Sequence, residues 1–197
     1  MKNNTQKANR SLNMLALCTL LVVAAVMSRI INAETHWYNF GPMVAISIFS
    51  GAILKNKSYA YLLPLAAYFV SDLYLEVAHG AGFYGISQFF VYGGMALVVL
   101  LGTAMRKQNV ARVLGFSIGG SLLFWIVSNF GVFLGGYWGT GLDGLATTYL
   151  MALPFYSTQG SELFLNAFVG DLLFSGILFG AYALLKSRFV APRAIAR

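Results

Sequence analysis

Long runs of hydrophobic residues, separated by short polar or charged segments, dominate this chain of 197 residues. A helix of about 20 apolar residues crosses the core of a bilayer, so runs of this kind predict membrane-spanning helices. We expect six spans, at 11–31, 42–54, 61–77, 84–104, 110–134 and 162–185. The second is short for a bilayer, and we therefore expect it to be tilted, irregular or sheltered by its neighbours.

The composition agrees with a membrane environment. Hydrophobic residues make up 58% of the chain, charged residues only 10%, and the mean hydropathy is +0.71. A soluble domain carries about 25% charged residues, so the surface of this chain must face lipid. No polar linker or low-complexity tract interrupts the pattern. We predict that residues 1–197 form a single all-α integral membrane domain, a bundle of six transmembrane helices.

The basic residues predict the orientation of this bundle. Twelve of the thirteen Lys and Arg residues precede the first span or follow the second, fourth or sixth span. The intervening loops hold Glu34, His36, His79 and Asp143, with no Lys or Arg. By the positive-inside rule, both termini are cytoplasmic, with tails at 1–10 and 186–197 and an outer loop at 135–160. The net charge of +7 is scattered over four short segments and therefore does not indicate nucleic-acid binding.

The first apolar stretch also has the layout of a secretory signal peptide, with a basic start and Asn32-Ala33 before Glu34. Its apolar run is long for that purpose, and Arg29 interrupts the region before the cleavage point. Its removal would also upset the alternation of charge between loops. We therefore favour a retained span.

Ionisable residues inside the predicted spans are candidates for function, because burying a charge in a bilayer is costly. Asp72, Glu76 and His79 are spaced i, i+4 and i+7, so they share one face of the third span. Arg29, in the first span, can neutralise either Asp72 or Asp171 of the sixth span. A purely structural ion pair is the alternative interpretation of these carboxylates.

Aromatic residues supply a second set of candidates. On the fifth span, Trp125 has serine hydroxyl groups on the same face and Asn129 beside it, which suits a ligand with polar edges or ordinary helix packing. The outer loop contains Tyr137, Trp138, Tyr149 and Phe155. We expect this loop, with a short helix at 142–153, to roof a pocket that opens to the outside, or to anchor the protein at the membrane interface.

Templates for membrane enzymes fit poorly. The run Gly115-Phe116-Ser117-Ile118-Gly119 matches the nucleophile-elbow pattern in letters, but no strand precedes it. The two histidines lie towards the outside, beyond the reach of Ser117. No cluster suits a structural metal, and no glycine-rich loop suits a phosphate. We expect no enzymatic activity, no intrinsic cofactor and no ATP hydrolysis by this chain.

Several short motifs, taken in order, resemble a known family. They are Asn39-Phe40-Gly41-Pro42, Pro64-Leu65, Ser71-Asp72-Leu73, Ser128-Asn129-Phe130-Gly131-Val132, Gly141-Leu142, Tyr149, Ala152-Leu153-Pro154-Phe155, Gly170-Asp171-Leu172 and Phe179-Gly180. Their order and spacing over roughly 29–181 resemble the small six-helix bacterial S components of energy-coupling-factor (ECF) vitamin transporters, and within that group the cobalamin transporter branch called BtuM.

This resemblance implies a substrate-binding and uptake protein of the bacterial cytoplasmic (inner) membrane. The implied substrate is a vitamin-like micronutrient, above all cobalamin or another corrinoid. The implied partner is an ECF transmembrane and ATPase module, although uptake by the chain alone stays open. The alternative is a structural or assembly membrane protein that binds no small molecule.

The BtuM branch carries a cysteine after the third helix as a ligand to cobalt, and His79 stands in that region here. A neutral imidazole can ligate cobalt axially, with Glu76 accepting a hydrogen bond from its other ring nitrogen. An interfacial histidine that only caps the helix is the alternative. The expected substrate-binding residues are Arg29, Asn39, Phe40, Asp72, Glu76, His79, Trp125, Asn129, Tyr137, Trp138, Tyr149, Phe155 and Asp171.

Overall fold

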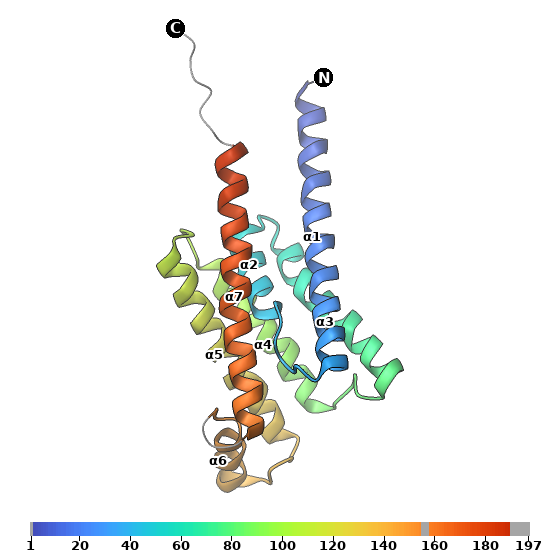
Figure 1. Cartoon of the computed structure of the whole chain (residues 1–197), viewed down its shortest axis with the longest axis vertical. Coiled ribbons are helices and arrows are strands. Elements are labelled where there is room, and N and C mark those ends of the chain that lie inside the picture. The colour runs from blue at the N-terminus through green and yellow to red at the C-terminus, as the bar shows by residue number, and fades with distance from the viewer. Residues whose placement is uncertain (1, 155–157, 190–197) are drawn as a thin grey trace.

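The structure, a computed structural model, describes residues 2–154 and 158–189, with side chains described for 19–154 and 162–184. The described residues form seven α-helices and no strand (Figure 1). The helices are α1 (Lys2–Thr35), α2 (Met43–Ile53), α3 (Lys57–His79), α4 (Ile86–Thr103), α5 (Val110–Leu134), α6 (Gly141–Met151) and α7 (Thr158–Phe189).

Each predicted span has a helix at its position, and α6 is the short helix expected in the outer loop. The amino end of α1 and the carboxyl end of α7 lie at the same end of the molecule, and α6 lies at the opposite end (Figure 1). The connections are short apart from the segment that contains α6.

The short helix α2 is the centre of the bundle. Nine of its eleven residues are buried, and it packs against α3, α4, α5 and α7. Eleven residues rise only about 16 Å, roughly half of a bilayer core of about 30 Å. Gly51 and Gly102 let α2 and α4 approach closely, because a Cβ at Gly51 would lie 2.2 Å from the carbonyl oxygen of Val99. The expectation that neighbours shelter this helix is confirmed.

Local sequence explains where α3 and α5 begin and where α3 ends. The side chain of Asn56 accepts a hydrogen bond from the backbone N–H of Ser58 (3.0 Å), and Asn109 does the same for Arg112 (2.9 Å). These are amino-terminal caps. Gly80 ends α3 in the left-handed conformation (φ 62°), which glycine adopts without strain. The cap fixes the direction in which the chain leaves His79.

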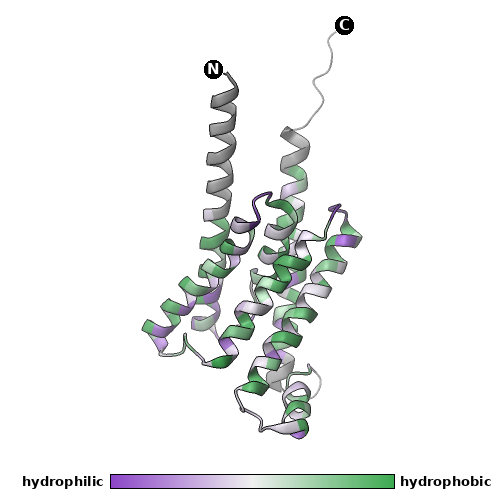
Figure 2. Cartoon of the chain, turned by 180° about the vertical axis from the view of Figure 1, so that it is seen from behind, coloured by the Kyte–Doolittle hydropathy of each residue, from purple (hydrophilic) through white to green (hydrophobic). Residues whose placement is uncertain are grey.

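Exposed apolar side chains line the outside of the helices. On α5 they recur at every fourth residue, at Val110, Leu114, Ile118, Leu122, Ile126, Phe130 and Leu134. A continuous exposed apolar stripe of this length would promote aggregation in water, and it suits contact with lipid. Among the described residues, α3, α4, α5 and the 162–184 part of α7 are long and apolar enough to cross a membrane. Hydrophilic residues gather at the helix ends and in the connections (Figure 2). The fold is that of a helical membrane protein.

Candidate ligand-binding site

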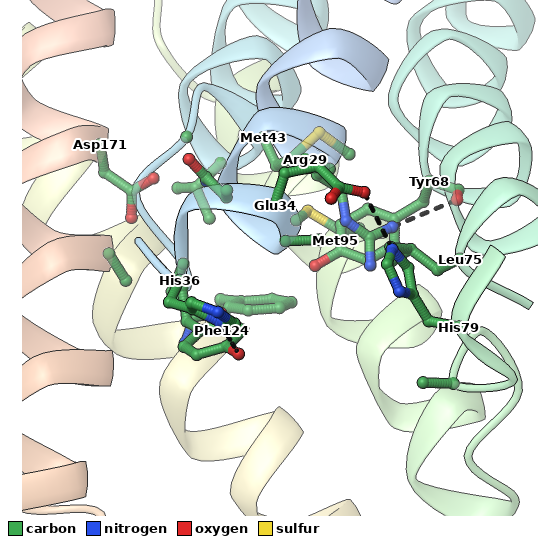
Figure 3. A pocket seen from close by; sticks show the side chains of 18 residues that line it. Arg29, Glu34, His36, Met43, Tyr68, Leu75, His79, Met95, Phe124 and Asp171 are labelled. Carbon is green, nitrogen blue, oxygen red and sulfur yellow. Dashed lines mark hydrogen bonds and ion pairs between the residues drawn. The ribbon is translucent and has the colours of Figure 1, made fainter.

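A cavity of about 510 Å³ is lined mainly by α1, α3, α7 and the start of α2, with one residue each from α4 and α5. The carboxyl ends of α1 and α3, which contribute to it, point away from the amino end of α1 (Figure 1). Exposed Glu34, His36 and His79 stand at its mouth, and buried Met95 and Asp171 contribute to its floor. Arg29 and His79 belong to one wall, and Asp171 faces them from α7 on the other (Figure 3). The cavity thus has ionisable groups on two sides, and one of them, Asp171, is buried.

Arg29 and Asp72 form an ion pair between α1 and α3, with 2.6 Å between Nη1 and Oδ1. The same guanidinium donates to the hydroxyl of Ser71 (2.6 Å) and stacks 4.0 Å from the ring centre of Tyr68. The other carboxylate oxygen of Asp72 accepts hydrogen bonds from α4, from Tyr92 (2.7 Å) and Gln88 (3.1 Å).

Asp72 is fully buried, and this network gives both of its oxygens charged or polar donors. A buried carboxylate is tolerated when it is paired and hydrogen-bonded in this way. The prediction that Arg29 neutralises one of the two buried carboxylates is confirmed, and the partner is Asp72. Arg29 also lines the cavity, whereas Asp72 does not.

Asp171, unlike Asp72, has no ion-pair partner and only one hydrogen-bond partner among the described residues. It is 4% exposed, and the hydroxyl of Ser121 on α5 lies 2.6 Å from its Oδ2. No cation lies within ion-pair distance of it among the described residues. The hydroxyl of Ser121 also lies 3.0 Å from the carbonyl oxygen of Ser117, one turn earlier on α5. Asp171 is therefore the buried acid of the cavity that no positive charge neutralises.

His79 pairs with Glu34 at the mouth of the cavity, with 3.0 Å between Nε2 and Oε1. Both side chains are well exposed, at 40% and 52%. Glu76 does not orient His79 as expected, because its Oε2 accepts the backbone N–H groups of Gly82 (2.9 Å) and Phe83 (3.1 Å). The carboxylate of Glu76 thus closes the turn after α3, and Glu34 of α1 takes the place beside His79.

The segment between α1 and α2 forms the rest of the mouth. His36 and Asn39 adopt positive φ angles of 58° and 65°, so the chain turns sharply here. Asn39 lines the cavity, and its side-chain amide donates to the carbonyl of Leu163 on α7 (3.4 Å). Phe40 packs its ring against Trp37 and Phe174 and lines a smaller neighbouring cavity of about 430 Å³. Of this pair, Asn39 belongs to the main cavity and Phe40 does not.

The aromatic residues of α5 and the outer loop form a separate cluster. Trp125 contacts the ring of Tyr149 on α6, and its indole N–H donates to the carbonyl of Ala152 (3.3 Å). Tyr149 donates its hydroxyl to the carbonyl of Ile126 (2.7 Å), and partial burial raises its pKa, which keeps it a donor. The side-chain amide of Asn129 donates a hydrogen bond to the carbonyl of Trp125, within α5 (2.8 Å). These contacts attach α6 to α5.

The expected roof is therefore wrong for the described part of the outer loop. None of residues 135–154 lines the cavity, and its mouth is bounded instead by the α1–α2 segment and the end of α3. Tyr137 and Trp138 contact each other at the far end, with 5.2 Å between ring centres. Phe155 lies outside the described residues. The sequence pattern could not reveal that α6 packs beside α5, away from α1 and α3.

Sequence reasoning missed several residues of the site. Glu34 and His36 entered only as charges of an outer loop, and Tyr68, Gln88 and Tyr92 not at all. Their signal was weak, since single tyrosine and glutamine residues within apolar helices are common at ordinary helix contacts and interfaces. Among the described residues, no three His, Cys, Asp or Glu side chains gather as a metal site.

The fold and the cavity define a helical membrane protein with a polar, small-molecule-sized site at one end. Residues 9–194 match the model of a family described as "Family of unknown function (DUF6580)", and the chain belongs to that family. No curated protein and no solved structure matched the chain.

Proposed function

We propose that this protein captures a small nutrient molecule at the outer face of a bacterial cytoplasmic membrane and takes part in its uptake. The observation that carries this proposal is the cavity. Its volume of about 510 Å³ is within the range of about 300–1,000 Å³ typical of ligand sites. Such sites combine an apolar lining with a few converging polar groups, and Arg29, Asp171 and His79 supply those groups here.

The proposed topology has six crossings, by α1 to α5 and α7, with both termini in the cytoplasm. The alternation of basic residues supports it, as does the position of the amino end of α1 and the carboxyl end of α7 on one side of the bundle (Figure 1). In this orientation the cavity opens to the outside. The central helix α2 crosses only part of the membrane and relies on the surrounding helices for shelter.

We assign the substrate to the class of vitamin-like micronutrients, with a corrinoid such as cobalamin as the first compound to test. The support is His79, whose Nε2 is engaged by Glu34 while its Nδ1 has no hydrogen-bond partner among the described residues. Nδ1 could therefore ligate cobalt while Glu34 orients the ring. A whole corrinoid exceeds the cavity, so its ring would lie across the mouth. An ECF-type ATP-driven module is the corresponding partner.

A structural role without any ligand is the second candidate, and the network around Asp72 favours it. Arg29, Asp72 and Tyr92 join α1, α3 and α4, and the network is complete without a substrate. Such a network can serve only to hold the helices together. This role leaves Asp171 and the pair of His79 with Glu34 unexplained.

The test is a thermal-shift screen of vitamins, cobalamin included, against the purified protein in detergent. A compound that binds only the folded protein raises its unfolding temperature. Ala167 lines the cavity, so Ala167→Phe should fill it and abolish the shift produced by any hit. Leu173→Phe is the matched control, because Leu173 lies on the same helix, is 48% exposed and faces away from the cavity. A screen without a hit, or hits that Ala167→Phe leaves unchanged, would favour the structural role.

A further inference from the structure

The hydroxyl of Ser121 is the described hydrogen-bond partner of Asp171, and it makes two contacts. Ser121 has a single hydroxyl hydrogen, yet its oxygen lies 2.6 Å from Oδ2 of Asp171 and 3.0 Å from the carbonyl oxygen of Ser117. If the carboxyl group of Asp171 is ionised, both neighbours of the hydroxyl are acceptors, and one hydrogen cannot serve both fully. An ionised Asp171 would take this hydrogen, and the contact of the Ser121 hydroxyl with the carbonyl of Ser117, which already accepts the backbone N–H of Ser121 within α5, would then not be a hydrogen bond.

A proton on Asp171 allows both contacts of Ser121 to be hydrogen bonds. The carboxylic acid then donates from Oδ2 to the hydroxyl oxygen of Ser121, and Ser121 donates to the carbonyl of Ser117. Each donor has one acceptor, and the distances fall in the range of O–H···O hydrogen bonds. The chain also removes an unpaired negative charge from a site that is 4% exposed within the apolar bundle.

The charged groups that face Asp171 are paired with other residues. Helices α5 and α2 pack against α7, but α2 contains no ionisable residue and the only one of α5 is Arg112, in its first turn. The groups that face Asp171 from the cavity belong to α1, the α1–α2 segment and α3. They are Arg29, Glu34, His36, Tyr38, Tyr68 and His79. Of these, Arg29 is neutralised by Asp72, and Glu34 is paired with His79.

A second, independent feature of this site is a pair of buried serine hydroxyl groups near Asp171. The hydroxyl groups of Ser117 and Ser175 are buried and have no hydrogen-bond partner among the described residues. The pairs Ser121–Asp171 and Trp125–Phe164 show that α5 and α7 run antiparallel. Ser117 and Ser175 therefore both lie one turn from the carboxyl group, towards the end with the termini. Unpaired hydroxyls are costly in a bilayer, and here they extend the polar surroundings of Asp171 by one helical turn.

From these observations we propose that Asp171 is a proton-binding site within the membrane, reached from the outer side through the cavity. The carboxylate takes one proton from water in the cavity, and the acid returns it the same way. A positively charged group of a substrate that entered the cavity would take the place of the proton. The site could thereby couple the binding of such a substrate to the release of a proton. This coupling rests on the proposed function, but the proton site itself does not.

Infrared difference spectroscopy of the protein in lipid vesicles tests the proton site without any substrate. A protonated carboxyl group gives a carbonyl band separate from those of carboxylates and of the backbone. We expect such a band at neutral external pH, shifted in D₂O and lost reversibly as the external pH is raised. Asp171→Asn should abolish the band. Asp143→Asn, at an exposed acid of α6, should leave it unchanged.

A second variant, Ser121→Ala, keeps the test decisive even if Asp171→Asn does not fold. Ser121→Ala removes the hydrogen-bond partner of the acid, so it should shift the frequency of the band without removing it. The proposal is overturned if the protein shows no carboxylic-acid band at neutral pH, or if the band survives Asp171→Asn. It is also overturned if sodium ions remove the band at constant pH, because Asp171 would then be a sodium site. A vitamin screen without hits would leave these outcomes unaffected.

Discussion

Arg29 and Asp72 approach each other to 2.6 Å between α1 and α3, where Asp72 has no exposed surface. Two neutral donors from α4 complete the shell of the carboxylate. The pair has no equivalent at Asp171, the other buried acid of the bundle, whose described partner is a serine hydroxyl. Asp72 is thus neutralised by a paired cation, whereas Asp171 has no such cation among the described residues.

Replacing Arg29 with alanine should destabilise the protein, because it strands the buried charge of Asp72. Breaking a buried pair by removing one partner costs about 3–5 kcal/mol. Thermal unfolding in detergent should show a clear drop in the transition temperature. A second change, Asp72→Asn, should restore part of the loss, since it removes the unpaired charge. Arg29→Ala with full stability but no ligand binding would show instead that Arg29 acts on the substrate.

Glycines of this bundle should differ sharply in their tolerance of alanine. A Cβ on Gly51 would lie 2.2 Å from the backbone of α4, whereas one on Gly115 would meet nothing within 4 Å. In a helix, alanine is otherwise favoured over glycine by roughly 0.5–1 kcal/mol. Gly51→Ala should therefore lower the unfolding temperature, and Gly115→Ala should leave it unchanged or raise it. Equal effects would contradict the close contact between α2 and α4.

The same comparison shows what the sequence could and could not predict. The spacing Gly115/Gly119 resembles a helix-contact motif, yet Gly115 faces open space. The close contact between two helices uses Gly51 of α2 and Gly102 of α4 instead. Hydrophobic periodicity indicates how a helix is rotated about its own axis. It does not indicate which helix faces it, because that depends on the packing of the whole bundle.

This distinction also explains the outcome for the candidate site. Arg29 was expected to pair with a buried acid, because an isolated charge in a bilayer is costly, and it does. The pairing of His79 with Glu34 joins residues that are 45 positions apart. It depends on where α1 ends relative to α3, which no local pattern encodes. The role of Trp125 was ambiguous for the same reason, and the structure places it against α6.

Cysteine labelling in whole cells should report the proposed orientation. After replacement of Cys18, the only cysteine, single cysteines can be introduced at Ser58 and Tyr137, which are both exposed. An impermeant thiol reagent should modify the cysteine of Tyr137→Cys and should leave that of Ser58→Cys unmodified until the cells are opened. Labelling of position 58 from outside would reverse the topology and place the cavity on the cytoplasmic side.

The last prediction concerns His79 and the choice of a corrinoid as substrate. If Nδ1 of His79 ligates cobalt while Glu34 holds Nε2, His79→Ala should weaken corrinoid binding by about tenfold or more, equivalent to about 1.4 kcal/mol. Binding should also weaken at acid pH, because a protonated imidazole cannot ligate a metal. Both effects can be measured by titration in detergent, with the visible spectrum of the corrinoid reporting its axial ligand.

Two variants separate ligation from simple contact. Glu34→Gln keeps the size of the side chain and removes its charge, so it should reduce affinity less than His79→Ala and leave the ligated spectrum in place. Glu76→Gln serves as the control for local folding, since Glu76 holds the turn after α3 and does not line the cavity. If His79→Ala binds the corrinoid as tightly as the parent and with the same spectrum, His79 is not a cobalt ligand. The micronutrient would then have to be sought among smaller molecules that fit wholly within the cavity of about 510 Å³.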